Sequence, residues 1–276
     1  MRVLLTNDDG IQAEGLQAMR RALLGVPGVE LVVIAPDSNR SATARSITTR
    51  RPIWVEELPF GDGTVGYATD GTPVDCVRFA TLGLVEGFEA ELIVSGINHG
   101  SNLGDDITYS GTVAAALEGI LLGIPGIAVS QQSAAREMDF RLGEQFDFEA
   151  AAAFTARLVE EMAAGAAGER ALPAGTLLNV NFPAGEVQGV EVARLGKRIY
   201  RDELAVQEQE GSRRLFRVYG DSPGYHHEEG TDLAAVAEGR VAVTPLHLDL
   251  TDEPGIETLR AYDLARLIGP AADEVR

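Results

Sequence analysis

The sequence predicts an α/β protein built on a mostly parallel sheet that is flanked by helices. Apolar runs at residues 3–5, 31–35 and 91–95 indicate strands, and the continuous β-branched and aliphatic run at 31–35 is typical of a strand that is buried on both faces. Between the first two runs, residues 14–24 carry apolar side chains at helical spacing. These segments form a βαβ unit, for which a right-handed crossover is expected.

Local signals place the other elements of the first half of the chain. Further strands are expected at residues 47–58 and 64–69, joined by a hairpin signal at residues 60–63. Thr72 begins a helix in favourable form, because Pro73 takes the first helical position and Asp75 follows the threonine cap by three residues.

The next elements alternate in the same way. A polar, glycine-rich loop at residues 96–111 follows the strand at 91–95, and Pro125 ends the helix that comes after this loop. The expected helices lie at residues 112–122 and 148–163, and the expected strands at residues 127–130 and 177–182.

Beyond residue 187 the pattern changes. Residues 190–194 and 215–219 alternate apolar with polar side chains, as antiparallel strands with one solvated face do. Residues 196–235 are expected to form a projecting hairpin arm, which cannot bury enough surface alone and therefore predicts a partner subunit. The expected domains are a core at residues 1–195 and a C-terminal part at 196–276, with the arm, a returning strand at about 240–246 and a terminal helix at about 256–268.

Composition and charge exclude several classes of protein. The 276 residues are 45% hydrophobic, which excludes disorder, and the net charge of −19 opposes contact with a nucleic-acid polymer or an anionic membrane. A single cysteine, Cys76, gives no disulfide framework. The apolar start is too short for a signal peptide, and the longest uncharged apolar stretch, 119–129, is too short to span a bilayer. We therefore expect a cytoplasmic protein.

The first strand ends in Asn7-Asp8-Asp9-Gly10, and the chain is organised around this segment. In an open α/β sheet, ligands bind outside the carboxyl ends of the strands. Asp8 and Asp9 can converge on one cation only if the backbone turns there, and Gly10 permits that turn. A capping carboxylate beside a solvated one explains this segment alone as well as a metal site does.

Two further loops open toward the same edge of the sheet, at residues 36–46 and 95–112. The second enters a helix through Ser110-Gly111-Thr112, and a helix N-terminus is a ready site for a phosphate. Ordinary N-capping equally explains Ser110 and Thr112. A site with carboxylate, amide and hydroxyl ligands favours Mg²⁺ or Mn²⁺ over zinc. His99 is a candidate acid or phosphate contact, although a solvated surface histidine is the simpler interpretation, and His226 and His227 fall in the arm.

Several blocks together resemble the survival protein SurE family. They cover essentially the whole chain, and their order and spacing are highly specific. The blocks are Asn7-Asp8-Asp9-Gly10, Ala35-Pro36-Asp37 with Arg40-Ser41-Ala42, Gly71-Thr72-Pro73 with Asp75-Cys76, Ser95-Gly96-Ile97-Asn98-His99-Gly100-Ser101-Asn102, Tyr109-Ser110-Gly111-Thr112-Val113 with Glu118-Gly119, and Thr244-Pro245-Leu246-His247.

The resemblance implies a metal-dependent phosphatase of nucleoside 5′-monophosphates, often also of 3′-nucleotides, with some exopolyphosphatase activity. It implies a Rossmann-like core and a C-terminal part exchanged between the subunits of a homodimer or homotetramer. One divalent cation per subunit, Mg²⁺ or Mn²⁺, is expected on Asp8, Asp9, Ser41 and Asn98. The substrate is expected on Asn102, Ser110, Gly111 and Thr112.

The mechanism that follows is attack by a metal-activated water, with Asp8 or Asp9 as the candidate base. An aspartyl-phosphate route is the alternative chemistry, although phosphatases of that kind usually place one residue between their two aspartates. A nucleotide-binding regulatory module without turnover is the rival from another functional class. It has no evident need for an acidic metal cage that faces a phosphate site.

Overall fold

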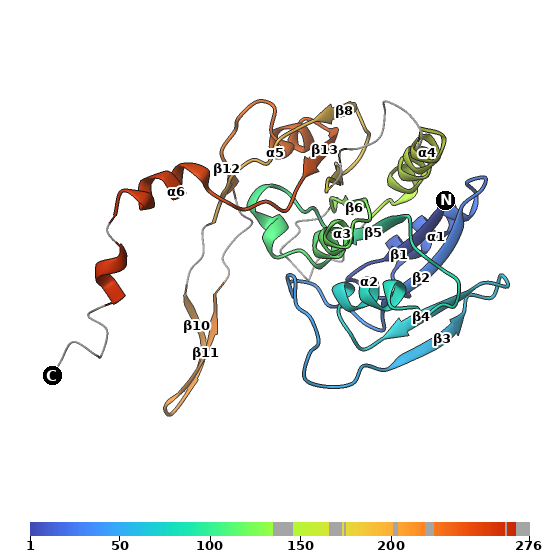
Figure 1. Cartoon of the computed structure of the whole chain (residues 1–276), viewed down its shortest axis with the longest axis horizontal. Coiled ribbons are helices and arrows are strands. Elements are labelled where there is room, and N and C mark those ends of the chain that lie inside the picture. The colour runs from blue at the N-terminus through green and yellow to red at the C-terminus, as the bar shows by residue number, and fades with distance from the viewer. Residues whose placement is uncertain are drawn as a thin grey trace.

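A nine-stranded sheet forms the centre of the described chain (Figure 1). The computed structural model describes residues 1–134, 146–165, 173, 175–200, 204–218, 224–262 and 264–268. The strands of the sheet are, in spatial order, β3 (Val55–Pro59), β4 (Val65–Thr69), β2 (Glu30–Pro36), β1 (Arg2–Thr6), β5 (Leu92–His99), β6 (Gly126–Gln131), β7 (Leu177–Phe182), β13 (Arg240–Leu246) and β8 (Gly189–Val192). The six central strands from β4 to β7 run parallel, which confirms the predicted fold class.

Helices cover both faces of this sheet. One face carries α1 (Glu14–Leu24) and α4 (Glu149–Gly165), and the other carries α2 (Pro73–Thr81) and α3 (Gly111–Leu121). Successive side chains of a strand point to opposite faces. Accordingly, Val3 and Leu5 of β1 pack with α1 and α4, whereas Leu4 packs with α2 and α3. The predicted strand at the N-terminus is therefore buried on both faces.

The strand order reverses between β1 and β5. From β1 the chain proceeds outward to β2 and β4, and then returns to the other side of β1 to form β5, β6 and β7. Such a switch point leaves a crevice at the carboxyl ends of the two strands, where ligands of open α/β sheets bind. The sheet thus places the loop after β1 beside the loop after β5.

Two strand predictions are corrected by the structure. The strand predicted at residues 47–58 is limited to β3, and residues 37–54 form a long loop without helix or strand. Arg51 and the backbone of Trp54 are bound by Asp70, so side-chain contacts fix this part of the chain in place of a ladder. The edge strand β8, which was predicted to be antiparallel, pairs in parallel with β13. The prediction was wrong because apolar–polar alternation indicates a solvated face but not the direction of the strand.

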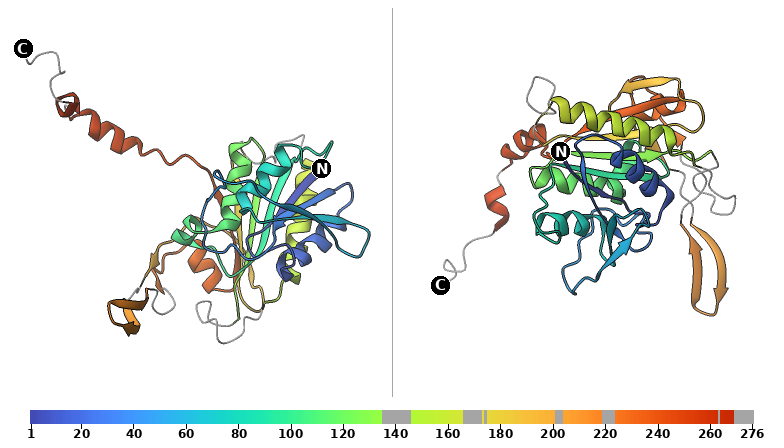
Figure 2. Two further views of the ribbon diagram at one scale, coloured as in Figure 1. Left: turned by 90° about the horizontal axis from the view of Figure 1, so that it is seen from below. Right: turned by 90° about the vertical axis from the view of Figure 1, so that its right-hand side faces the viewer.

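The projecting arm is shorter than the predicted 196–235. It contains β9 (Arg198–Ile199), paired with β12 (Gly224–Tyr225), and the hairpin of β10 (Ala205–Glu210) and β11 (Arg213–Arg217), which extends from the body (Figure 2). Residues 201–203 and 219–223 lie outside the described residues. Within the predicted arm, α5 (Asp232–Ala237) instead packs on β13 with Leu233 and Val236 buried.

The terminal helix predicted at about 256–268 is divided in two. The first part is α6 (Glu253–Arg260), which begins with Pro254 in its first turn, and the second is the 3₁₀ helix η2 (Leu264–Ile268). Both project away from the body of the molecule, and α6 has no buried residue (Figure 2). No helix within the described ranges is both long and apolar enough to cross a membrane.

Gly15 sets the distance between α1 and the end of β5. An added Cβ at this position would lie 2.1 Å from the carbonyl oxygen of Ile97 and 3.2 Å from the ring of Phe148. The backbone of α1 can therefore approach β5 closely only where residue 15 has no side chain. This contact lies immediately before Asn98 and His99.

We expect Gly15→Ala to destabilise the protein by about 1–3 kcal/mol, as overpacking of a closed site does. Helix propensity alone favours alanine, so the sign of the change separates packing from propensity. The measurement is urea unfolding followed by circular dichroism. Gly25→Ala, where the added methyl meets nothing closer than 3.3 Å, is the matched control. A stabilised Gly15→Ala protein would contradict the close approach of α1 to β5.

Candidate active site

The turn after β1 is fixed by its own residues. The side chain of Asn7 donates to the carbonyl of Gly10 at 2.9 Å and accepts from its N–H at 3.2 Å. Gly10 has φ of +109°, a conformation that favours glycine. The backbone therefore turns at the predicted position, and Asp8 and Asp9 are no longer held on opposite faces of a strand.

Asp8 is buried against the start of α3. Its side chain is only 2% exposed, and the Thr112 hydroxyl donates to its Oδ1 at 2.5 Å. A Cβ on Gly111 would lie 2.8 Å from Oδ2, so glycine is needed for this approach. Burial raises the pKa of Asp8, and the Thr112 hydroxyl with the backbone N–H groups of Thr112 and Gly111 offsets part of this rise. The positive end of α3 thus holds a carboxylate of the protein itself.

Asp9 joins the other two loops at this edge of the sheet. Its Oδ1 accepts from the side chain of Asn39 at 3.2 Å, in the loop after β2, and its Oδ2 accepts from the backbone N–H of His99 at 3.0 Å, at the end of β5. Asp9 is partly exposed, in contrast to Asp8. The two adjacent carboxylates therefore connect different parts of the same site.

Asn98 meets Asp8 through a shared hydroxyl. The Thr112 hydroxyl lies 3.2 Å from Asn98 Oδ1 while it bonds Asp8, and Asn98 Nδ2 donates to the carbonyl of Gly100 at 2.7 Å. The register of β5 against β6 shifts between Ser95 and Asn98, and such irregularities redirect side chains near functional sites. Asp8, Asn98 and Thr112 thus form one buried polar cluster.

Ser41 lies on the loop that follows β2. The backbone N–H of Arg40 donates to the carbonyl of Asp8 at 2.6 Å, and the N–H of Ser41 donates to the Asn39 side chain at 2.9 Å. Asn39 in turn donates to Asp9. Ser41 itself is exposed. The two residues before it, Asn39 and Arg40, contact Asp9 and Asp8.

Ser110 and Asn102 have structural contacts of their own. The Ser110 hydroxyl accepts from the N–H of Val113 at 3.1 Å, which makes Ser110 the N-cap of α3. Asn102 is buried, and its side chain donates to the Ser130 hydroxyl at 2.8 Å. These bonds fix the positions of both predicted substrate residues.

Two asparagines of β7 hold Asn102 and were missed by the sequence analysis. Asn181 accepts from the N–H of Asn102 at 2.8 Å, and the side chains of Asn179 and Asn181 both donate to its carbonyl, at 2.9 and 3.0 Å. Both lie in a strand that is otherwise apolar and fully buried. Buried polar side chains in such a run are the signal that could have identified them.

The structure corrects the interpretation of His99 as a solvated surface residue. Its ring stacks on Phe148 at 4.9 Å between centroids and packs at 5.0 Å from Phe146. The N–H of Gly15 donates to its Nε2 at 3.4 Å, and burial lowers the pKa of this histidine. His99 is therefore packed against Phe146 and Phe148 and accepts a hydrogen bond from α1. His226 and His227 are exposed in the arm.

The donor set fits a hard divalent cation. Asp8, Asp9, Ser41 and Asn98 offer carboxylate, hydroxyl and amide oxygens, which are the ligands preferred by Mg²⁺ and Mn²⁺. Because residue 111 is a glycine, the Asp8 carboxylate can lie directly against the start of α3. Any larger residue at this position would collide with it. Within the described ranges, no three His, Cys, Asp or Glu side chains form a group that could hold a metal ion, so the proposed set has two carboxylates and depends on an amide and a hydroxyl for its other ligands.

Comparisons with known proteins identify the family of the chain. A family model described as "Survival protein SurE" matches residues 3–202. The chain is 52% identical to a protein from Rubrobacter xylanophilus named 5′-nucleotidase SurE, over 97% of this chain and 99% of that one. A protein of the same name from Chloroflexus aggregans is 44% identical over 95% and 99%. The crystal structure of a SurE protein from Aquifex aeolicus superposes with a TM-score of 0.76, at 37% identity, over 94% of this chain and 98% of that chain.

We expect Thr112→Val to destabilise the protein by about 2 kcal/mol at a pH above the raised pKa of Asp8, where the buried carboxylate is ionised and loses its hydroxyl donor. The substitution raises the pKa of Asp8 further. Stability that depends on the ionised form is present above this pKa, and the difference from wild type should shrink as the pH falls through it.

The measurement is chemical unfolding across that pH range. Thr155→Val is the matched control, since the hydroxyl of this buried threonine bonds only a helix carbonyl, of Ala151, at 2.8 Å. A loss that is equally large in acid would contradict the assignment of the Thr112 hydroxyl to the Asp8 carboxylate.

Proposed function

Because the chain belongs to the survival protein SurE family, we propose that it is a 5′-nucleotidase, a hydrolase of nucleoside 5′-monophosphates that needs a divalent cation. The observation that carries this proposal is the buried Asp8 carboxylate at the N-terminus of α3. A phosphate bound at this helix start lies beside an anion of the protein. Two neighbouring anions repel each other, and a cation between them would remove this repulsion.

We assign one Mg²⁺ or Mn²⁺ per subunit to Asp8, Asp9, Ser41 and Asn98. Each carboxylate oxygen can accept more than one bond, so the contacts of Asp8 to Thr112 and of Asp9 to Asn39 and His99 leave acceptor capacity for a cation. When bound, such a cation stabilises negative charge on the phosphoryl group and makes a neighbouring water more acidic.

The residues of the chain bind and orient the phosphoryl group in this proposal. Asn102, with Ser110, Gly111 and Thr112 at the start of α3, contacts the non-bridging oxygens, whose charge must be stabilised in the transition state. The main chain of Asn102 is held by two buried asparagines, so it is positioned before substrate arrives. Asp8 or Asp9 takes the proton of the attacking water.

The adjacency of Asp8 and Asp9 supports attack by water over an aspartyl-phosphate. Phosphatases that form an aspartyl-phosphate usually place one residue between their two aspartates, whereas here no residue separates them. Activity on 3′-nucleotides and short polyphosphate belongs to the same proposal, because the assigned residues bind a phosphoryl group and not a base. A cytoplasmic location stays a prediction.

We expect Mn²⁺-dependent phosphate release from AMP, GMP and p-nitrophenyl phosphate that EDTA abolishes. Asp8→Asn should lower kcat/KM by about 1,000-fold, since several kcal/mol of charge stabilisation are lost. Mn²⁺ at about 100 times its Kd should also add about 2.7 kcal/mol to the stability of wild type but not of Asp8→Asn.

The control is Asp249→Asn, at an exposed aspartate that bonds only within its own turn. Release that persists in EDTA, or substantial activity in Asp8→Asn, would contradict the metal assignment. Binding of AMP without turnover would instead favour the nucleotide-binding regulatory module.

The C-terminal part, residues 196–276, is proposed to join subunits of a homodimer or homotetramer, apart from the catalytic core at residues 1–195. The segment after β13, which projects from the body, has solvent-exposed apolar side chains, with Leu250 88% and Ile268 87% exposed. The amphipathic helix α6 buries none of its residues against its own subunit. Apolar surface of this kind needs a partner, and exchange of the segment between subunits would cover it.

We expect the double variant Leu250→Glu, Leu259→Glu to dissociate the oligomer, because both apolar side chains become charged on the exposed segment. Sedimentation velocity measures the change. The matched control is Thr251→Glu, Thr258→Glu, which adds the same charge at exposed polar positions of the segment. A wild-type monomer, or equal dissociation in both variants, would contradict this role of the segment.

A further inference from the structure

The loop that carries Ser41 is held by polar anchors and not by packing. Residues 37–54 contain no helix or strand, and Ile47 near the middle is 59% exposed. A cavity of about 610 Å³ lies beneath this loop, between α2 and α3. The cavity interrupts the packing beneath the loop, and directed bonds to Asp75 and Glu118 hold the loop on its two sides.

The segment next to Ser41 is strained. Ala42 and Ala44 have φ of 57° and 53°, in the left-handed region that alanine rarely adopts. Strained residues persist only where surrounding contacts determine their conformation. One contact precedes the strain, from the N–H of Arg40 to the carbonyl of Asp8 at 2.6 Å.

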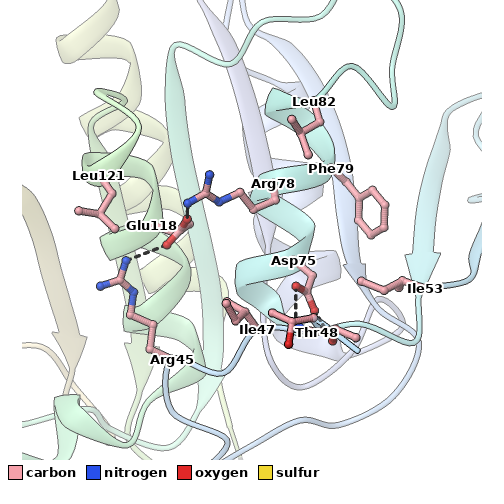
Figure 3. Close-up of a pocket in the computed structure, with 11 residues that line it drawn as sticks. Arg45, Ile47, Thr48, Ile53, Asp75, Arg78, Phe79, Leu82, Glu118 and Leu121 are labelled. Atoms are coloured by element: carbon pink, nitrogen blue, oxygen red, sulfur yellow. Dashed lines mark hydrogen bonds and ion pairs between the residues drawn. The ribbon is translucent and has the colours of Figure 1, made fainter. Parts of the chain in front are cut away.

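Two contacts follow the strain: the Thr72 hydroxyl donates to the carbonyl of Ser46 at 2.8 Å, and Arg45 forms an ion pair to α3. Arg45 Nη2 lies 2.8 Å from Oε2 of Glu118, whose side chain is only 3% exposed. Figure 3 shows this carboxylate between two guanidinium groups, that of Arg45 from the loop and that of Arg78 from α2. Nearby, Thr48 donates through its hydroxyl to Asp75 at 2.7 Å. Glu118 therefore connects the Ser41 loop to the helix whose first residues form the phosphate site.

We propose that Glu118 is a positioning residue for the cation site, a role that rests on the proposed function. Through Arg45 it holds residues 41–44 in their left-handed conformation and so keeps Ser41 beside Asp8 and the start of α3. Glu118 lies seven residues after Gly111 on one rigid helix, so the ion pair places the metal ligand and the phosphate site in a common frame. The polar contacts of Glu118 thus act on affinity for the cation without touching it.

The two arms of Glu118 provide a matched experiment. Arg45→Gln breaks the arm to the loop, and Arg78→Gln breaks the arm to α2 while the loop contact remains. Neither residue belongs to the proposed metal or substrate set. We expect Arg45→Gln and Glu118→Gln to weaken Mn²⁺ binding by about tenfold, as loss of an outer contact of a metal site does, with kcat at saturating Mn²⁺ nearly unchanged. Arg78→Gln should change Mn²⁺ affinity less than Arg45→Gln.

Two readouts do not depend on activity. Electron paramagnetic resonance of free Mn²⁺ gives the dissociation constant. Hydrogen exchange reports the N–H of Ala44, which donates to the carbonyl of Tyr109 at 3.1 Å, and this N–H should exchange faster in Arg45→Gln than in Arg78→Gln. Adding Ala44→Gly to Arg45→Gln should restore part of the Mn²⁺ affinity, because glycine adopts the left-handed conformation without strain.

Equal Mn²⁺ affinity in Arg45→Gln and Arg78→Gln, or unchanged exchange at Ala44 in Arg45→Gln, would overturn the positioning role. Failure of the glycine to restore affinity would overturn the part assigned to strain. If wild type binds no Mn²⁺, the proposed metal site itself fails, and this outcome is distinct because the exchange of Ala44 still reports whether Glu118 holds the loop.

Discussion

The buried carboxylate of Asp8 is the constraint to which the rest of the site responds. Removing a charge from water is costly unless hydrogen bonds or an opposite charge replace the solvent. The Thr112 hydroxyl and the start of α3 provide part of that compensation, and only a glycine at position 111 lets the helix come close enough. The same burial raises the pKa of Asp8, which means that the ionised carboxylate is disfavoured here and that a nearby cation would stabilise it.

The sheet topology explains why three distant loops meet at this carboxylate. The strand order reverses at β1 and β5, so the loops after β1, β2 and β5 leave the same edge. Their mutual contacts are directed bonds, such as Arg40 to Asp8 and His99 to Asp9, and few of them are apolar. Directed bonds fix orientation as well as distance, which a binding site for a cation and a phosphoryl group requires.

The sequence was informative wherever the signal was local. The turn at Gly10, the capping box of Thr72 with Asp75, and the helix 14–24 were all predictable from neighbouring residues. The contacts that could not be predicted from the sequence join distant positions, such as Asn102 and Asn181, which are 79 residues apart. Short elements were also hidden, because α5 has six residues and too few turns to show a helical period.

The arm and the substrate loop share their anchors. Arg198 at the base of the arm lies 2.6 Å from Asp106, in the 3₁₀ helix η1 (Gly104–Thr108) that follows Asn102. The buried Asp232 accepts from the N–H groups of both Gly104 and Gly196, at 2.8 Å each. The segment proposed to contact a second subunit is therefore rooted in the loop proposed to bind the phosphoryl group. Gly104 lies two residues after Asn102, so one buried carboxylate, that of Asp232, anchors both the base of the arm and the end of the substrate loop.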